Sequence, residues 1–357
     1  MKSRILLLLL LVLLVGGHLL PAAAQEPTVG LGQSDELGTF LVGPNGMTLY
    51  SFPPDPINNS VCYNACAENW PPLYVDSADS LSAADGIPGT LSVIERADGQ
   101  LQVAYNGIAL YYWARDKEPG DTTGHRVGRV WWVVPPATVY AQRIPELGWT
   151  LVGPTGMTLY MFKNDAPGVS NCVDQCATNW PPLTVESADA FVPGVNLPGE
   201  FSFVERADST LQVAYNGWPL YYWKDDAAIG DAKGEGVNEV WFTVAPETVA
   251  LTSTDELGDF LVTSDGMTLY TFANDSAGVS NCADECLDNW PAFTVFDASE
   301  RLVAGAGIEG ELGVIERADG DLQVTYNGMP LYFWKDDKVP GDALGQGRGE
   351  VWFVAAP

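Results

Sequence analysis

Histidine and basic residues are scarce in this sequence. Only two of its 357 residues are His, and 17 Lys and Arg stand against 46 Asp and Glu. Beyond residue 24 the only His is His125, which does not recur in the repeats described below. A Ser-His-Asp or Cys-His catalytic system therefore cannot be repeated along the chain, and zinc or cupredoxin-type sites lack their usual ligand. We expect no enzymatic activity and rank a repeated hydrolase lowest.

The charge balance excludes a second set of functions. The formal net charge is −29; without Lys2 and Arg4, which precede a predicted cleavage site, 15 basic and 46 acidic residues leave −31. A chain this acidic repels phosphate groups instead of releasing their counterions, so nucleic acid and anionic membrane surfaces are not expected partners. The charge suits solubility, cations or basic partners.

Long hydrophobic runs are absent after the N-terminus. Two basic residues precede an apolar run over residues 5–15, and Ala22–Ala24 offers a small-residue cleavage site, which predicts a signal peptide over residues 1–24. A run extended to Leu20 leaves a retained N-terminal anchor as the alternative. A lipid anchor is not expected, because the first Cys is Cys62. We predict a secreted or cell-envelope protein with no transmembrane domain in its mature chain.

Cysteine occurs only in three Cys-x-x-x-Cys pairs. These are Cys62/Cys66, Cys172/Cys176 and Cys282/Cys286. Six Cys allow about 15 connectivities, and the recurrence of each pair in the same setting favours a disulfide within each copy of an exported chain. Residues i and i+4 of one helical turn lie close enough for such a bridge. A redox or metal-handling role for the pairs, with Met47, Met157 and Met267 as soft Cu(I) ligands, is the alternative.

The chain does contain a repeat of about 110 residues. Glu36-Leu37-Gly38, Cys62 and Trp70 each recur twice at that spacing. The period equals a small self-sufficient domain and is too long for a solenoid unit. We therefore expect a linker over residues 25–35 and repeats over residues 36–137, 144–248 and 254–357. The third repeat has one additional residue, which we place in a loop over residues 305–311.

Each repeat has the pattern of short β-strands. In the first we expect strands at residues 39–42, 47–52, 73–75, 91–95, 101–105, 109–113 and 130–134, and a short helix at 61–69 capped by Ser60. Asn106-Gly107 predicts a type I′ turn. The fold class is therefore mainly β: three tandem small antiparallel β domains, sandwich or barrel-like, each with one short disulfide-bearing helix. Because the two halves of a repeat have similar sequence patterns, we expect two sheet halves packed face to face.

The similarity between the two halves centres on the motif Tyr-x-[Phe/Trp]-x-x-Asp. The period of a strand points the Tyr and the second ring to one face, and the Asp falls in the turn that follows. We expect a structural or binding role for these residues. The six copies are Tyr50/Phe52/Asp55, Tyr111/Trp113/Asp116, Tyr160/Phe162/Asp165, Tyr221/Trp223/Asp226, Tyr270/Phe272/Asp275 and Tyr332/Trp334/Asp337.

These motifs resemble a known family. Taken with Cys-x-x-x-Cys before Asn-Trp-Pro and with Tyr-Asn-Gly-x-x-Leu-Tyr-x-Trp, they resemble the bacterial secreted repeat of unknown function. Members of that family are predicted lipoproteins that often carry the motif in tandem. The resemblance covers nearly the whole mature chain and implies export and repetition without an established activity. This chain departs from the family in lacking the Cys of a lipoprotein signal.

Acidic loops after the second motif of each repeat are candidate cation sites. Carboxylates and carbonyls on Gly-rich loops suit Ca²⁺, although the spacing matches neither an EF-hand nor a nonapeptide repeat. The favoured alternative is a turn cap, in which Asp accepts backbone N–H bonds. We expect no cofactor, with Ca²⁺ as the one candidate. The Asp-x₄-Asp pairs are Asp116/Asp121, Asp226/Asp231 and Asp337/Asp342.

The remaining expectations concern arginine and the aromatic residues. Arg96, like Arg206 and Arg317, stands in a recurring Glu-Arg-Ala-Asp string, and we expect it to pair with the motif Asp, with a ligand-binding role as the alternative. Most rings should build the cores, with a stacking platform for sugar or a flat cofactor as the alternative. Trp149 and Trp218 have no counterparts and are expected to be exposed.

Together these observations predict a secreted, monomeric tandem-repeat β protein. Its expected role is an extracytoplasmic binding or structural module for a protein or a small ligand, without catalysis. The alternative is a cell-envelope redox or metal-handling accessory that uses the Cys pairs.

Overall fold

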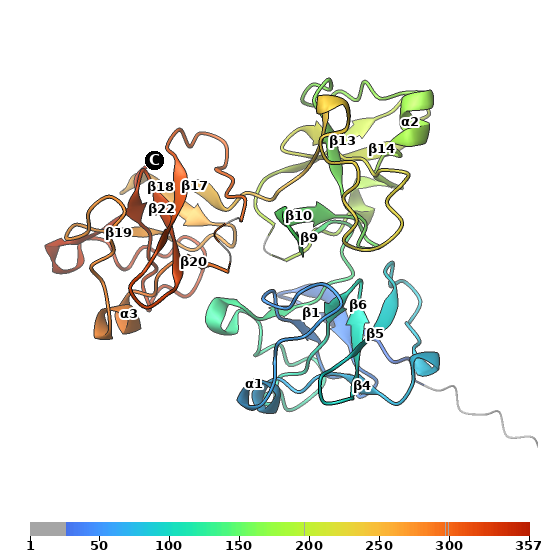
Figure 1. The fold of residues 1–357 in the computed structure, drawn as a ribbon, viewed down its shortest axis with the longest axis horizontal. Helices are drawn as coiled ribbons and strands as arrows, with labels where there is room; N and C mark the ends of the chain where they lie inside the picture. The colour runs from blue at the N-terminus through green and yellow to red at the C-terminus, as the bar shows by residue number, and fades with distance from the viewer. Residues whose placement is uncertain (1–25, 196, 297, 299) are drawn as a thin grey trace, which may run out of the picture.

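The computed structural model describes residues 26–195, 197–296, 298 and 300–357, and the predicted signal peptide lies outside them. Three β-rich units follow one another along the chain and lie in a triangle (Figure 1). Within the described part of the chain, no helix has the length and apolarity that crossing a bilayer requires. The fold is mainly β, as predicted.

Each unit has eight short strands and one α-helix among its described residues. The first contains β1 (Gly30–Ser34), β2 (Gly38–Val42), β3 (Tyr50–Ser51), α1 (Ala65–Asn69), β4 (Tyr74–Val75), β5 (Leu91–Glu95), β6 (Leu101–Tyr105), β7 (Ile108–Ala109) and β8 (Trp132–Val133). The second contains β9 (Tyr140–Ile144), β10 (Gly148–Val152), β11 (Tyr160–Phe162), α2 (Gln175–Asn179), β12 (Thr184–Val185), β13 (Phe201–Glu205), β14 (Leu211–Tyr215), β15 (Trp218–Pro219) and β16 (Trp241–Thr243). The third contains β17 (Val249–Thr254), β18 (Gly258–Thr263), β19 (Tyr270–Phe272), α3 (Glu285–Asn289), β20 (Thr294–Val295), β21 (Leu312–Glu316), β22 (Leu322–Tyr326), β23 (Met329–Pro330) and β24 (Trp352–Val354).

The sheets of a unit are small and antiparallel. In the first, β1 pairs with β2, β3 pairs with β8, and β6 lies between β4 and β5 with β7 added to it. The turn between β6 and β7 confirms the predicted type I′ turn. Asn106 and Gly107 have φ angles of 51° and 76°, and this turn type needs both angles positive. A 3₁₀ turn, η2 (Val127–Arg129), precedes β8.

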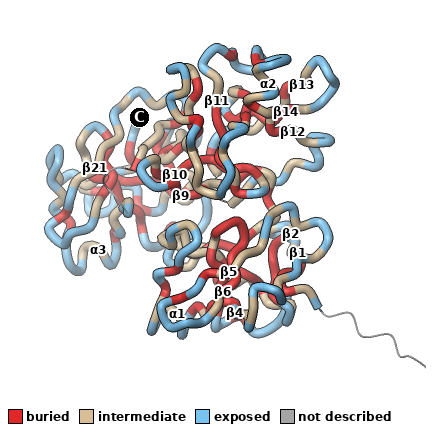
Figure 2. The backbone as a smooth tube through the Cα atoms, turned by 45° about the vertical axis from the view of Figure 1, so that its right-hand side comes forward, coloured by how far each residue is buried: buried red, intermediate tan, exposed pale blue. Residues whose placement is uncertain are grey.

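Two cores lie on opposite sides of the motif segments. Leu49 and Leu110 point into an aliphatic cluster, whereas their neighbours Tyr50 and Tyr111 point into a cluster of Trp and Cys side chains. The other units repeat this division. Because side chains alternate along a strand, one Leu-Tyr dipeptide contributes to both cores, and burial follows these strands through each unit (Figure 2).

The two motif segments of a unit pair edge to edge, which corrects the expected face-to-face packing of two halves. Tyr50 and Tyr111 form an antiparallel bridge in which each backbone N–H donates to the other residue's carbonyl oxygen, at 2.8 and 3.0 Å. Regular pairing is confined to the Tyr because the chain then bends to place the Asp. The strands expected at residues 47–52 and 109–113 are therefore reduced to β3 and β7.

The helix and three boundaries also differ from expectation. Helix α1 begins at Ala65, because Asn64 before it has a φ of 53°. Ser60 does not cap it; its hydroxyl is used in the hydrogen-bond network described below. Strand β1 lies inside the expected linker, and β9 and β17 fill most of the gaps left between the expected repeats, at residues 138–143 and 249–253.

The additional residue of the third unit lies earlier than predicted. The amide of Val303 donates to the hydroxyl of Thr248 as that of Val192 does to Thr138, so the shift of one residue is complete before Val303. Strand β20 still aligns with β12 at the original spacing. The extra residue therefore falls between Val295 and Val303.

Candidate binding site

The six motifs form reciprocal Tyr–Asp pairs across the two halves of each unit. The hydroxyl of Tyr50 donates to Asp116 at 2.6 Å, and the hydroxyl of Tyr111 donates to Asp55 at 2.5 Å. The corresponding pairs are Tyr160–Asp226 and Tyr221–Asp165 in the second unit, and Tyr270–Asp337 and Tyr332–Asp275 in the third, at 2.6 to 2.7 Å. Each half thus supplies the donor for one pair and the acceptor for the other.

Burial sets the protonation of these pairs. Desolvation raises the pKa of Tyr50 and Tyr111 above their ordinary value, and the hydrogen bond to the partner carboxylate adds to the shift. Burial also raises the pKa of Asp55 to about 6, against the lowering effect of its hydrogen bonds. At neutral pH the tyrosines therefore stay protonated donors, and the motif Asp acts as an acceptor that ends a strand.

In each unit the Phe of one motif and the Trp of the other form a stack of four rings together with two further Trp. In the first, Phe52 stacks on Trp131, Trp131 on Trp70, and Trp70 on Trp113, with centroid distances of 4.4, 3.8 and 4.0 Å. The stacks in the second and third units have the same order. Because the three Trp of the first stack are buried, its rings form core and not an open platform.

The stack of the second unit differs at its last ring. Trp223 is half-buried, whereas its counterparts Trp113 and Trp334 are buried. Its ring lies 4.2 Å from that of Trp180 with a tilt of 35°, and the ammonium group of Lys224 lies 5.3 Å from its centroid. Phe52, Phe162 and Phe272, at the other end of the stacks, are also half-buried. The remaining eight of the twelve motif rings are buried, so most of these rings build the cores, as expected.

The recurring Arg joins the motif to the segment before the helix. Arg96 donates to the Ser60 hydroxyl, the Gln102 side chain and the Cys62 carbonyl oxygen, at 2.6 to 2.7 Å. The Ser60 hydroxyl in turn lies 2.7 Å from that of Tyr111. The predicted direct pair with the motif Asp is therefore wrong, because a Ser and a Tyr stand between the two charges. Arg206 and Arg317 make the equivalent bonds.

The cysteines form the three predicted local disulfides, and no described Cys is free. The Cα atoms of each pair are 5.2 to 5.4 Å apart, within the range that a disulfide can bridge. The bridges are Cys62–Cys66, Cys172–Cys176 and Cys282–Cys286.

The expectation of two Cys on one helical turn is wrong in its geometry. The first Cys of each pair is buried against the ring stack and precedes the helix. The second Cys lies within the helix and is only half-buried, at Cys66 in α1, Cys176 in α2 and Cys286 in α3. The backbone turns between the two positions, because the residue before each helix has a positive φ of 50° to 53°. Each bridge therefore ties a helix to the segment that the recurring Arg holds.

The acidic loops use their carboxylates on the protein itself. Asp116 accepts from Tyr50 with one oxygen and from Thr123 with the other, and Asp121 accepts two backbone amides, of Lys117 and Glu118. The corresponding residues Asp226, Asp231, Asp337 and Asp342 also accept bonds from their own loops. Among the described residues, no group of three His, Cys, Asp or Glu side chains is placed to hold a metal.

His125 is held inside the first unit. Its Nδ1 accepts the amide of Val133 at 3.3 Å, and its ring packs edge-on against Trp132. Burial lowers its pKa to about 4. The ring is therefore neutral at physiological pH and contributes to packing.

Contacts between the units close the triangle. The first and second units share Gln142, whose side-chain amide donates to the Asn106 carbonyl oxygen at 2.6 Å. The second and third are joined by Arg143 and Glu300, 3.4 Å apart. Arg126 of the first unit donates to Asp265 of the third at 2.9 Å, so each unit contacts both others.

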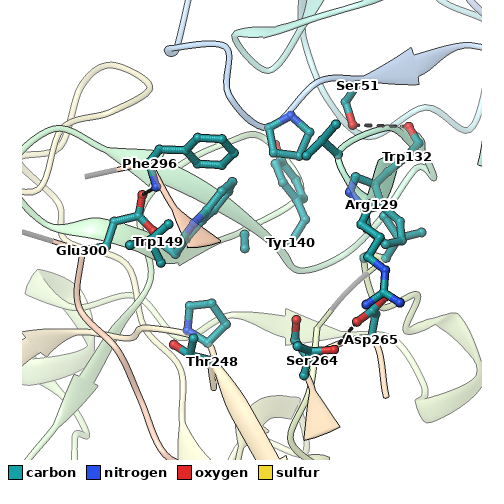
Figure 3. Close-up of a pocket in the computed structure, with 18 of the residues that line it drawn as sticks. Ser51, Arg129, Trp132, Tyr140, Trp149, Thr248, Ser264, Asp265, Phe296 and Glu300 are labelled. Carbon is teal, nitrogen blue, oxygen red and sulfur yellow. Dashed lines mark hydrogen bonds between the residues drawn. The ribbon is translucent and has the colours of Figure 1, made fainter. Parts of the chain in front are cut away.

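A cavity of about 400 Å³ lies where the three units meet (Figure 3). Strands β9 and β10 form one side, the segment after β20 a second, and η2 with β8 a third. Arg129 of η2 lies 3.8 Å above the ring of Phe333, beside Asp265. The aromatic lining consists of Tyr105, Trp132, Tyr140, Trp149, Phe293, Phe296 and Phe333. The volume lies within the range of small-molecule sites, and the lining combines apolar residues with polar and charged ones.

Comparison with known proteins identifies the family. The model of the secreted repeat of unknown function matches six segments, at residues 33–74, 92–135, 143–184, 202–245, 251–294 and 313–356. The chain belongs to this family. Each secreted-repeat segment contains one Tyr–x–[Phe/Trp]–x–x–Asp motif, so the family unit is half of a folded unit. No curated protein and no solved structure matches the chain.

The cavity of this secreted-repeat protein is lined where its repeats differ from one another. Trp149 corresponds to Thr39 and Asp259, and Phe296 corresponds to Asp76 and Glu186. Trp149 was expected to be exposed but is half-buried here, as is Trp218 outside the cavity.

Two further cavity residues also break the repeat, and sequence reasoning missed them. Tyr140 corresponds to Gly30 and Ala250, and Arg129 corresponds to Glu239 and Glu350. The signal that could have found them is the one that singled out Trp149: a large or charged residue without a counterpart in the other copies.

Proposed function

We propose that this protein is an extracytoplasmic binding module that takes a small ligand in the cavity between its three units, with no catalytic step. One observation carries the proposal: repeat positions that hold small or acidic residues in the other units hold Arg and large rings where they face the cavity. Four such departures, at Arg129, Tyr140, Trp149 and Phe296, lie around one cavity, which a purely scaffolding role does not require.

The fold supports this role by making the units rigid. Motif pairs, ring stacks, buried Arg and disulfides all lie within a unit, so they serve its own stability. The cavity is instead formed by contacts between units. A ligand that bridges two units would therefore stabilise the closed triangle, as any ligand of the native state must.

Calorimetric titration of the whole mature chain with small aromatic compounds tests the proposal. We expect saturable binding of one molecule per chain and a rise in unfolding temperature. Trp149→Ala should weaken the binding at least tenfold. Trp218→Ala is the matched control, since Trp218 is also half-buried and without counterparts but lies outside the cavity. Equal weakening by both variants, or no binding, would reject the cavity as the site.

A further inference from the structure

Arg129 supplies an unpaired positive group to the cavity. Its Nη1 atom is buried and has no hydrogen-bond partner among the described residues. Burial lowers the pKa of this guanidinium below its ordinary value, against the raising effect of Asp265. A buried donor without an acceptor is unfavourable, and more so when the group is charged. The position therefore favours any occupant that brings an acceptor.

The nearest carboxylate does not fill this need. One oxygen of Asp265 accepts the Nη2 of Arg126 at 2.9 Å, and its other oxygen accepts the hydroxyl of Thr263. Asp265 and Arg126 thus satisfy each other. Arg129 is left stacked on Phe333, with its guanidinium beside Asp265 (Figure 3).

The other acids of the cavity are also engaged. Glu300 accepts the amide of Phe296 at 3.1 Å and lies 3.4 Å from Arg143. Glu247 accepts the side-chain amide of Asn216 at 2.8 Å. A second lining cation, Arg301, has a buried Nε without a partner among the described residues. The lining therefore holds three engaged acids and two Arg that each have a buried nitrogen without a partner among the described residues, and these two Arg are the groups that can receive an anion.

We propose that the cavity selects a small ligand that joins a flat apolar or aromatic body to a carboxylate, with the carboxylate received by Arg129 and the body packed among Tyr140, Trp149 and Phe296. Planar guanidinium donors match carboxylate oxygens, and such charge-assisted bonds are about twice as strong as neutral ones. The rings provide stacking surfaces of the matching kind. This inference rests on the proposed function and adds the class of ligand.

Three probes with one ring system test it: 2-naphthoate, neutral 2-naphthamide and cationic 2-naphthylmethylammonium. Each is titrated calorimetrically into the whole mature chain. We expect 2-naphthoate to bind at least tenfold tighter than 2-naphthamide, and the cation to bind most weakly. Equal affinity of the first two, or tighter binding of the cation, overturns the carboxylate inference and leaves the binding module standing. Failure of all three overturns both.

A pair of variants assigns the charge to its residue. Arg129→Met keeps a stem over Phe333 and should remove the preference for 2-naphthoate while changing the affinity for 2-naphthamide less than twofold. Arg348→Met is the control, because Arg348 lies 4.3 Å above the ring of Trp334 in the same kind of contact outside the cavity. Loss of both probes in Arg129→Met would make Arg129 structural and overturn its role. Thermal unfolding of each variant checks that it is folded.

Discussion

At the scale of single residues, the family motif is a hydrogen-bond exchange. The Tyr and the Asp of one motif do not bond to each other. The Tyr of each motif donates to the Asp of the other motif in the unit. A Tyr hydroxyl can donate one bond and accept others, and Tyr111 uses this capacity to connect Asp55 to Ser60. The spacing of Tyr and Asp in one motif therefore places both residues to bond with the other motif segment, in addition to forming a turn.

Tyr111→Phe should destabilise the first unit by about 1–3 kcal/mol, because it leaves one oxygen of the half-buried Asp55 without its donor, while the other still accepts the amide of Val61. Tyr112→Phe is the matched control, since the equivalent residue of the third unit is already Phe333. Hydrogen exchange of β5 and β6 in the whole chain measures the effect. Similar exchange rates in the two variants would contradict a special role for the Tyr–Asp bond.

The pH dependence of stability follows from the raised pKa of Asp55. Its pKa is about 6 in the fold against an ordinary 3.8, so the folded state holds the proton more tightly than the unfolded state. The stabilising contribution is complete below pH 3.8 and is lost as the pH rises to about 6. After allowance for partial exposure of the carboxyl, it amounts to about 1–3 kcal/mol.

The unfolding temperature of the first unit should therefore rise when the pH falls from 7 to 5, the reverse of ordinary acid destabilisation. Burial also raises the pKa of Asp165 and Asp275, so the other units should shift in the same direction. Asp55→Asn should flatten the response of the first unit alone. A response that is unchanged in this variant would remove Asp55 as its source.

At the scale of elements, the segment before each α-helix is fixed from two sides. The disulfide closes a loop of few residues, with a sequence separation of 4, and loop-closure entropy assigns it about 2 kcal/mol. Arg96 satisfies three acceptors on two segments. Loss of the Arg leaves all three without their donor in a buried site, and each lost partner is unfavourable by about 1–3 kcal/mol.

Arg96→Met should therefore destabilise the first unit more than the double substitution Cys62→Ala/Cys66→Ala. Urea unfolding followed by hydrogen exchange of β5 and β6 compares the two. Arg115→Met is the control, because Arg115 is exposed. A larger loss in the Cys variant would show that the disulfide, and not the Arg, holds this segment.

The sequence predicted strands well where the pairing partner is close in the chain. The hairpin of β5 and β6 and the turn at Asn106 follow from alternation and turn chemistry over about 20 residues. The prediction from sequence failed where bonds between distant residues determine the structure. Tyr50 pairs with Tyr111, and Ser60 bonds to Arg96 instead of capping a helix. Such contacts join residues that no local pattern connects.

At the scale of the whole molecule, the cavity depends on the contact that closes the triangle. The pair Arg126–Asp265 is partly exposed, and pairs of this kind contribute about 0–1 kcal/mol each. The cation–π contact of Arg129 with Phe333 is worth about 0.5–2 kcal/mol. The first and third units are therefore held together weakly, while each unit is held together strongly.

Arg126→Ala combined with Arg129→Ala should separate the first and third units without lowering the stability of any unit. Fluorescence transfer between labels on these two units should show a longer mean distance. High salt should also lengthen this distance in the unaltered chain, because salt screens exposed ion pairs. Arg115→Ala is the control. An unchanged distance would mean that the contacts of the second unit alone set the arrangement.

The candidate site itself was beyond the reach of periodic reasoning. Motifs and spacing describe what the units share, whereas the cavity is lined by Arg129, Tyr140, Trp149 and Phe296, which they do not share. Only Trp149 was noticed as unmatched, and its half-buried position between units depends on how the triangle closes. No pattern within one unit specifies that arrangement.

The exchange of Tyr and Asp between two halves also limits how such chains can lengthen. A lone half would leave one buried hydroxyl without its acceptor and one buried or half-buried carboxyl without its donor. Duplication in steps of two motifs keeps every such pair intact. The six motifs of this chain are three such steps.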